Sequence, residues 1–308
     1  MKMTIYYILD ITKILVTTGA IYMGRELIEL DSTMLIDLNT NRNCTAPNYP
    51  IALRGATGVL ANDMILICGG GYFTEGFFPR LECISDCYKL YKGRKTFDAF
   101  NSMSEKRCYA SSTVVHNQLV WITGGCLKNF DNGLITTDIT NSSAMFSGVN
   151  LPKPNNKHVI IMLNDTTALL IGGFWLQNGN NETYYYNYDN NIWTVGPCLQ
   201  EGRYLHTAGV IKDNTTHKEH LVVAGGLKSP GEEPLKSVEI LFSNETTWSI
   251  GNISVNVWEL IRISQCNGIE NSNFLYEQCI KEVKFCSNLS WMYFSKQYYF
   301  RSLAKQVL

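Results

Sequence analysis

The stretch Met64-Ile-Leu-Ile-Cys-Gly-Gly70 ends an apolar run on a pair of glycines, and the chain repeats this arrangement four more times, once with Thr18-Gly19 in place of the pair. The other copies are Lys13-Ile-Leu-Val-Thr-Thr-Gly19, Leu119-Val-Trp-Ile-Thr-Gly-Gly125, Ala168-Leu-Leu-Ile-Gly-Gly173 and Leu221-Val-Val-Ala-Gly-Gly226. The closing glycines stand at 19, 70, 125, 173 and 226, so the steps between them are 51, 55, 48 and 53 residues. A period of this length is typical of repeat architectures. The sequence therefore predicts one structural unit that recurs along the chain.

Each repeat has further matching positions. A bulky residue precedes an arginine by ten positions in three repeats, in the pairs Cys44 and Arg54, Phe97 and Arg107, and Trp193 and Arg203. Trp248 fills the bulky position of the fifth repeat. Between the glycines and this residue lies a β-branched or aromatic run such as Thr183-Tyr-Tyr-Tyr-Asn-Tyr188. This composition is typical of strands, so each repeat is predicted to contain four strands.

Turn chemistry supports the four-strand unit. The predicted turn between strands one and two carries Asn62-Asp63, His116-Asn117, Asn164-Asp165 and Asp213-Asn214, residue types that tolerate left-handed geometry. The glycine pairs are Gly69 and Gly70, Gly124 and Gly125, Gly172 and Gly173, and Gly225 and Gly226. We interpret them as structural, because a pair of this kind permits positive φ or close backbone approach. No amphipathic helix follows them, which excludes a phosphate cradle.

These features resemble the kelch repeat, which forms one four-stranded blade of a β-propeller. The resemblance covers about residues 4 to 250 and implies an all-β, kelch-type β-propeller of about six blades, the last one degenerate. It also implies that Trp193 and Trp248 pack between neighbouring blades and are largely buried. The third repeat departs from the pattern, because Met145-Phe146 stands at the tryptophan position and Lys157-His158 stands where arginine would follow.

The predicted domain organisation has two parts. Residues 1–250 hold five recognisable blades, and residues 251–308 form a degenerate sixth blade or a divergent tail. We interpret residues 1–16 as two blade strands rather than a signal peptide, because Asp10 and Lys13 interrupt the apolar stretch. The net charge of −1, with 17% charged residues, provides no basic stripe for nucleic acid. No apolar run is long enough to span a membrane.

Cysteines and glycosylation sequons bear on the compartment. The chain has ten cysteines, and we expect disulfides among some of Cys83, Cys87, Cys108 and Cys126, with Cys68 as an ordinary buried thiol. Eight Asn-x-Ser/Thr sequons lie at Asn43, Asn141, Asn164, Asn181, Asn214, Asn244, Asn252 and Asn288. Together they favour a secreted, extracellular glycoprotein, with a cytoplasmic protein as the alternative.

The sequence shows no convincing catalytic constellation, and we expect no enzymatic activity, no cofactor and no metal site. Cys83-x3-Cys87 has no second pair at zinc-site spacing. His217 and His220 lie in a polar loop, where a solvated turn is the simpler interpretation. A propeller oxidase would need a Tyr-Cys cross-link and two histidine ligands, and no positions here can be assigned to them.

A binding scaffold remains, with function in the loops that follow the glycine pairs. Large and charged residues in these loops are candidate contacts, namely Tyr72, Phe73, Phe77, Phe78, Arg80, Phe130, Phe174, Trp175, Lys228 and Glu232. The alternative interpretation is that about half of them fill the loop bases. We expect an interaction module for a protein or glycan partner. An intracellular kelch adaptor for a ubiquitin ligase or actin is the second hypothesis, and the oxidase is the third.

Overall fold

The computed structural model describes residues 3–10, 13–23, 26–37, 42–61, 63–91, 93–116, 118–127, 133–141, 144–212 and 218–254. Throughout these ranges the chain forms strands, turns and loops, and no helix. It follows that none of the described segments is a helix able to cross a membrane. The predicted sixth blade or tail lies outside the described residues from 255 onward.

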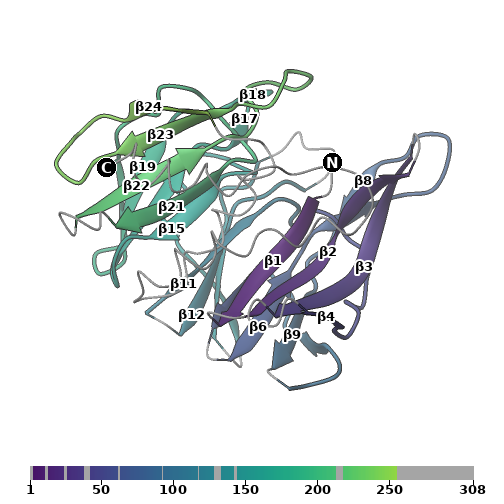
Figure 1. The fold of residues 1–308 in the computed structure, drawn as a ribbon. Coiled ribbons are helices and arrows are strands. Elements are labelled where there is room, and N and C mark those ends of the chain that lie inside the picture. Colours follow the sequence, from purple (N-terminus) through teal and green to yellow (C-terminus); the bar gives the residue numbers. More distant parts are fainter. Residues whose placement is uncertain are drawn as a thin grey trace.

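Five antiparallel sheets of four strands each succeed one another along the chain (Figure 1). The first contains β1 (Met3–Asp10), β2 (Lys13–Met23), β3 (Glu26–Asp37) and β4 (Arg42–Thr45). The second contains β5 (Thr57–Ala61), β6 (Met64–Cys68), β9 (Cys87–Tyr91) and β10 (Asp98–Phe100). The third contains β11 (Ser111–Val115), β12 (Leu119–Thr123), β13 (Thr137–Thr140) and β14 (Met145–Ser147).

The fourth sheet contains β15 (Val159–Met162), β16 (Thr167–Ile171), β19 (Thr183–Asn187) and β20 (Ile192–Val195). The fifth contains β21 (Thr207–Lys212), β22 (Glu219–Ala224), β23 (Ser237–Leu241) and β24 (Ser249–Ser254). Two short ribbons follow glycine pairs: β7 (Gly71–Phe73) with β8 (Leu81–Cys83), and β17 (Phe174–Trp175) with β18 (Asn178–Gly179). The prediction of four strands per repeat is confirmed, including the two strands near the start of the chain.

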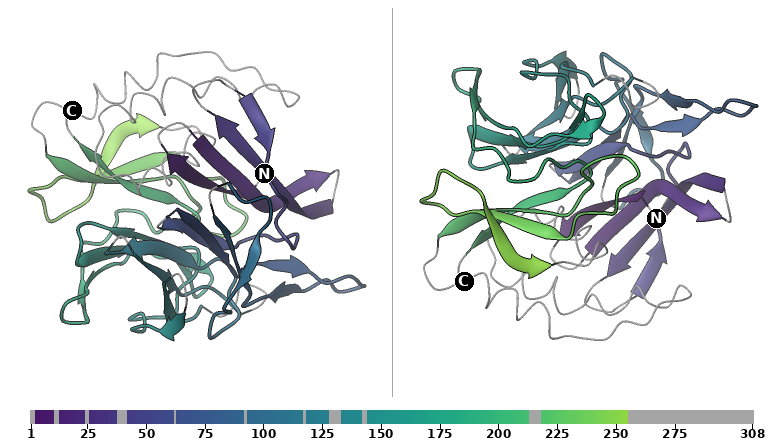
Figure 2. Two further views of the ribbon diagram at one scale, coloured as in Figure 1. Left: turned by 90° about the horizontal axis from the view of Figure 1, so that it is seen from below. Right: turned by 90° about the horizontal axis from the view of Figure 1, so that it is seen from above.

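The sheets follow one another in a curved row (Figure 2). Their first strands β1, β5, β11, β15 and β21 pack side by side in chain order. Hydroxyl groups join neighbouring first strands: Thr57 Oγ1 and Ser112 Oγ are 2.7 Å apart, and Ser111 Oγ accepts the Ile160 N–H at 3.1 Å. The apolar second strands lie behind this row and supply much of the core, as the fully buried pattern of β6 shows.

The glycine pairs connect each sheet to the next. The closing glycine donates its N–H to the carbonyl four residues before the next sheet begins, in the pairs Gly19 to Leu53, Gly70 to Arg107, Gly125 to Asn155 and Gly173 to Arg203, at 2.7–2.9 Å. The first glycine of a pair approaches the same carbonyl so closely that a Cβ on Gly69 or Gly124 would lie 2.4 Å from it. Both have positive φ, 64° and 59°. This geometry supports a structural role for the glycine pairs.

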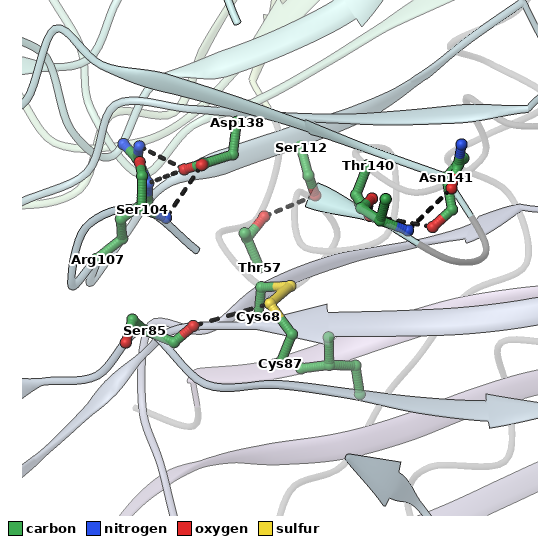
Figure 3. The surroundings of a disulfide bond; sticks show 12 residues. Thr57, Cys68, Ser85, Cys87, Ser104, Arg107, Ser112, Asp138, Thr140 and Asn141 are labelled. Carbon is green, nitrogen blue, oxygen red and sulfur yellow. Dashed lines mark hydrogen bonds and ion pairs between the residues drawn. A yellow bond between two sulfur atoms is a disulfide. The ribbon is translucent and has the colours of Figure 1, made fainter. Parts of the chain in front are cut away.

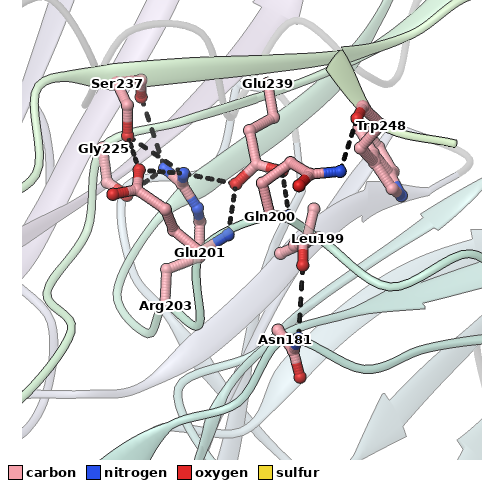
Figure 4. A network of polar contacts seen from close by, with 9 residues as sticks. All are labelled: Asn181, Leu199, Gln200, Glu201, Arg203, Gly225, Ser237, Glu239 and Trp248. Carbon is pink, nitrogen blue, oxygen red and sulfur yellow. Dashed lines mark hydrogen bonds and ion pairs between the residues drawn. The ribbon is translucent and has the colours of Figure 1, made fainter. Parts of the chain in front are cut away.

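Buried arginines occupy this connecting position before two of the sheets. Arg107 Nη2 pairs with Asp138 Oδ2 at 2.6 Å, and Arg203 Nη2 pairs with Glu239 Oε1 at 2.6 Å (Figure 4). Before the fourth sheet the position belongs to Asn155, whose Nδ2 donates to Gly172 O at 2.8 Å. Sequence spacing had placed Lys157-His158 there. The backbone hydrogen bond from Gly125 instead identifies Asn155 as the residue equivalent to Arg107 and Arg203, because all three lie four residues before a first strand. The equivalent position is therefore two residues before Lys157.

The tryptophan positions also connect neighbouring sheets. Trp248 is 2% exposed, and its indole N–H donates to Pro197 O at 2.9 Å. Trp193 makes the equivalent bond to Asn150 O at 2.9 Å and packs beside Trp121 and Tyr186. Trp193 is only half-buried, so the expectation that both are largely buried is wrong for this one. It lies on β20, at the outer edge of its sheet.

Two disulfides stabilise the second sheet and its ribbon. Cys68 on β6 and Cys87 on β9 stand directly opposite each other and form one of them (Figure 3). Cys83 and Cys108 form the other. Pairing among the four expected cysteines is confirmed in part, whereas the expectation of a thiol at Cys68 is wrong, because the sheet register brings its partner across from it. Both bonds suit an oxidising environment.

Two buried histidines make the fold sensitive to acid. Burial lowers the pKa of His158 and His206 to about 3, and the Arg203 charge adds to the effect at His206. The unfolded chain binds these protons below about pH 6.5, whereas the folded chain does not. Stability from this source is therefore present near neutral pH and is lost as the pH falls.

We expect the free energy of unfolding to be lower at pH 5 than at pH 7 by about 2 kcal/mol per histidine. Urea denaturation at both pH values measures this difference. His158→Gln removes one titrating group and should remove about half of the change. An unaltered pH dependence in this variant would show that the buried imidazoles do not cause it.

Candidate functional site

Four residues at equivalent positions form a continuous backbone row where the first strands begin. Gly55, Tyr109, Lys157 and Leu205 each lie two residues before a first strand and have φ between 52° and 62°. The N–H of Tyr109, Lys157 and Leu205 each donates to the carbonyl of the preceding member, at 2.7, 2.8 and 3.0 Å. We call these four residues the inner row. It brings together the segments that precede four of the sheets.

Lys157 is the central cation of this row. Its Nζ lies 4.4 Å from the ring centroid of Phe174, 5.0 Å from that of Tyr204 and 5.5 Å from that of Tyr109. Burial among these rings lowers the pKa of the Lys157 ammonium to about 8, and the nearby Cys126 opposes the shift. A partly desolvated amine beside aromatic faces is well suited to hold an anionic or polar ligand group.

A second cation lies next to the inner row. The Arg54 guanidinium stands 4.4 Å over the Phe73 ring and pairs with Glu29 of β3, to which its Nε donates at 2.8 Å. Sequence spacing had grouped Arg54 with Arg107 and Arg203. In the structure Leu53 takes that position, since it supplies the carbonyl bonded by Gly19. Arg54 therefore lies one residue after the connecting position, and its guanidinium lies against Phe73 of the β7–β8 ribbon.

Three buried cysteines gather beneath the β7–β8 ribbon. The sulfur atoms of Cys83, Cys108 and Cys126 lie within 4.8 Å of one another, packed with Leu81 and Tyr109. Cys83 and Cys108 are bonded to each other, so Cys126 is the one thiol among the three. Sequence spacing could not reveal this cluster, because its members come from β8, from the inner-row segment and from the residue after Gly125.

The β7–β8 ribbon presents the most exposed of the predicted contacts. Phe77 is 98% exposed and Phe78 is 82% exposed, and their ring centroids are 6.0 Å apart. Tyr72 and Arg80 are also exposed. Phe73 instead packs at the ribbon base, against the cysteine cluster. The ribbon thus combines an anchored base with an apolar tip in solvent, which we define as residues 74–80.

The other predicted contacts divide between packing and surface. Phe174 is buried against Tyr204, with centroids 4.7 Å apart, and Trp175 is half-buried with Lys153 Nζ 5.5 Å from its ring. Lys228 and Glu232 are exposed, and the Lys228 carbonyl accepts the Gly179 N–H at 2.7 Å. Phe130 lies outside the described residues. The expectation that part of the set fills loop bases therefore describes Phe73 and Phe174 well.

The sequons differ in their accessibility. Asn164, Asn181 and Asn244 are exposed, and Asn141 is half-buried. Asn43 lies on β4 and Asn252 lies on β24, where only the backbone is described. Asn214 and Asn288 lie outside the described residues. Three sequons thus satisfy the first requirement of a glycan acceptor, an asparagine in contact with solvent.

Several residues of the site were missed in the sequence. Lys157, Tyr109 and Tyr204 meet around one cation, and Glu29 joins Arg54. The inner row can be found in the sequence as the residues two positions before each first strand. Finding it requires the start of every first strand to be predicted without an error of even one residue. Comparison with protein-family models finds no match to this chain, and comparison with curated proteins finds no relative.

Proposed function

We propose that the chain is a kelch-type β-propeller with about six blades. The proposal is supported by five four-stranded sheets in chain order, with adjacent first strands, and by glycine pairs that bond to the next sheet. Further support comes from Trp193 and Trp248, whose indole N–H groups bond Asn150 O and Pro197 O at equivalent positions. A crystal structure with an open stack of sheets would contradict it.

Within this architecture, we propose a non-enzymatic module that binds a protein or glycan partner through the face formed by the loops that follow the glycine pairs. The observation that carries the proposal is the ribbon tip, where Phe77 and Phe78 are exposed to solvent on a base fixed by a disulfide. Exposed aromatic residues are costly to leave in water and are what binding hot spots use. Lys157 adds positive charge on the inner row, whereas the charge of Arg54, beside Phe73, is paired with Glu29.

The double substitution Phe77→Ser and Phe78→Ser is expected to abolish partner capture with little change in melting temperature, since both side chains contribute little to the core. Immobilised wild-type protein and the variant should be probed with a glycan array and a panel of displayed extracellular proteins. Ligands retained by the wild type should be lost by the variant.

The matched control is Val195→Ser, which removes an apolar side chain that is 75% exposed on β20, away from the ribbon. This variant should keep every ligand. If the double variant keeps them too, the ribbon tip is not the binding surface. A large fall in its melting temperature would instead assign Phe77 and Phe78 to packing.

We also propose an extracellular location. Its support is the pair of disulfides, which suit oxidising conditions, and the three exposed sequons. Mass spectrometry of the native protein tests this directly through the peptide containing Asn181. An unmodified asparagine together with reduced Cys68 and Cys87 would contradict the assignment.

A further inference from the structure

The cysteine cluster holds a disulfide and a thiol in immediate contact. Cys83 and Cys108 are bonded, and Cys126 is a thiol whose S–H donates to the Cys108 carbonyl at 3.4 Å. All three sulfur atoms lie within 4.8 Å of one another, and all three residues are fully buried. Exchange between a thiol and a disulfide requires this proximity and a thiolate able to attack.

The backbone already places Cys108 and Cys126 as partners. Cys108 donates its N–H to Cys126 O at 2.9 Å, and Cys126 donates to Cys108 O at 2.8 Å. Cys68 and Cys87 also stand directly opposite each other on paired backbone segments, and they do form a disulfide with Cα atoms 4.1 Å apart. The two pairs differ in backbone pairing, because Cys108 and Cys126 exchange both of their N–H···O bonds, whereas the bond from the Gly69 N–H to Asp86 O places Cys68 and Cys87 at a pair without direct backbone bonds. What the two pairs share is direct opposition, and between Cys108 and Cys126 it brings the sulfur atoms within 4.8 Å.

The positive charge of Lys157 favours the thiolate form of a nearby cysteine. It interacts with Cys126 across the inner row. A neighbouring cation stabilises a thiolate, which is the nucleophilic form of cysteine. Because burial lowers the pKa of Lys157 to about 8, its amine can accept and return a proton near neutral pH.

We propose that Cys83, Cys108 and Cys126 form a thiol–disulfide exchange site, in which one disulfide moves between Cys83–Cys108 and Cys108–Cys126. The Cys126 thiolate attacks Cys108 Sγ, the bond from Cys108 to Cys83 breaks, and Cys83 leaves as a thiolate. The proton lost by Cys126 ends on Cys83. One disulfide is broken and one is formed, so the exchange consumes no oxidant or reductant.

The exchange changes how the ribbon is held. Cys83 is the last residue of β8, and its bond to Cys108 ties the ribbon to the segment before β11. Moving the bond to Cys126 removes this covalent link while the inner row keeps its backbone bonds. An effect on partner binding rests on the function proposed above, whereas the exchange itself does not.

Disulfide mapping of the intact wild-type protein tests the exchange. The protein is incubated at mildly alkaline pH and then denatured at acidic pH in the presence of N-ethylmaleimide, which traps the buried thiols without further exchange. The sample is digested and analysed by mass spectrometry. We expect linked peptides of both kinds, with the alkylated thiol divided between Cys126 and Cys83. If Cys83–Cys108 is the sole linkage in this cluster and Cys126 alone is alkylated, the proposal is wrong.

Two variants sharpen the result. Cys83→Ser should form the Cys108–Cys126 disulfide, and Cys126→Ser should retain Cys83–Cys108. Cys198→Ser, which removes an exposed thiol elsewhere, should match the wild type. An intact Cys68–Cys87 bond in each sample reports that the second sheet has folded. Reduced Cys108 and Cys126 in a folded Cys83→Ser protein would overturn the exchange, independently of any ligand.

Hydrogen exchange tests the effect on the ribbon. Amides of residues 81–83 should exchange faster in Cys83→Ser than in Cys126→Ser, since only the first variant loses the covalent tie. Equal rates would overturn the inference that the disulfide controls the ribbon. Equal rates would not bear on the thiol–disulfide exchange itself, which disulfide mapping measures separately.

Discussion

Glu239→Ala is expected to lower the free energy of unfolding by about 3–5 kcal/mol, because it removes the fully buried carboxylate from the Arg203 guanidinium and leaves only the partly exposed Glu201, 3.3 Å away. Both side chains are completely buried, and Arg203 Nη2 lies 2.6 Å from Glu239 Oε1 (Figure 4). The carboxylate also accepts the N–H groups of Gln200 at 2.6 Å and Glu201 at 3.1 Å. Urea denaturation followed by fluorescence measures the loss.

An exposed ion pair provides the matched control. Lys106 Nζ and Glu82 Oε1 are 2.8 Å apart at the surface, so Glu82→Ala should cost less than about 1 kcal/mol. A comparable loss from both substitutions would show that burial of the pair is not what matters.

The fourth sheet supplies a second control for this prediction. There Asn155 holds the position of the arginine, with its Nδ2 bonded to Gly172 O, and Tyr184 holds the position of the acid, with its hydroxyl bonded to Glu182. Arg203→Asn combined with Glu239→Tyr introduces these two uncharged residues, and it should be more stable than Glu239→Ala. A double variant less stable than the single one would contradict the idea that the unpaired charge causes the loss.

Trp248→Ala is expected to lower the free energy of unfolding by about 3–5 kcal/mol, the range for removing a fully buried aromatic side chain. The indole packs among Leu169, Leu199 and Val223, so its removal leaves a cavity between the fourth and fifth sheets. It also leaves Pro197 O without the indole N–H. Thermal and urea denaturation both measure the change.

Trp193→Ala is the natural comparison, because Trp193 makes the equivalent bond to Asn150 O but is only half-buried. We expect a smaller loss of about 1–3 kcal/mol. Equal losses for the two tryptophans would mean that the shared hydrogen bond, rather than the buried area, sets their contribution.

Much of the fold could be predicted because its signals are local. The second strands are apolar runs that stop at glycine pairs, and the polar turns before them use residues such as Asp63 and His116, which adopt φ of 59° and 50°. Such signals depend on a few adjacent residues, so one sequence reveals them. The bulky residues were placed to within one residue: Cys44 and Trp193 lie on fourth strands, and Phe97 and Trp248 lie directly before theirs.

The candidate site was harder to predict because its residues meet across sheets. Phe77 and Phe78 were correctly expected at an exposed loop, since apolar residues beside glycine and proline in a long connection favour a surface tip. Lys157 was assigned to the wrong position, and Tyr109 and Tyr204 were not considered. An error of one or two residues in a strand start is enough to hide a row of this kind.

The sequence by itself determined that the chain is built from repeated four-stranded sheets, because periodicity, turn residues and glycine pairs act within each repeat. Only the tertiary structure decided that Cys68 bonds Cys87, that Asn155 replaces an arginine, and that Cys83, Cys108 and Cys126 share one buried cluster. These contacts join residues from different strands and sheets. Their geometry depends on strand register and on the stacking of neighbouring sheets, which no local pattern specifies.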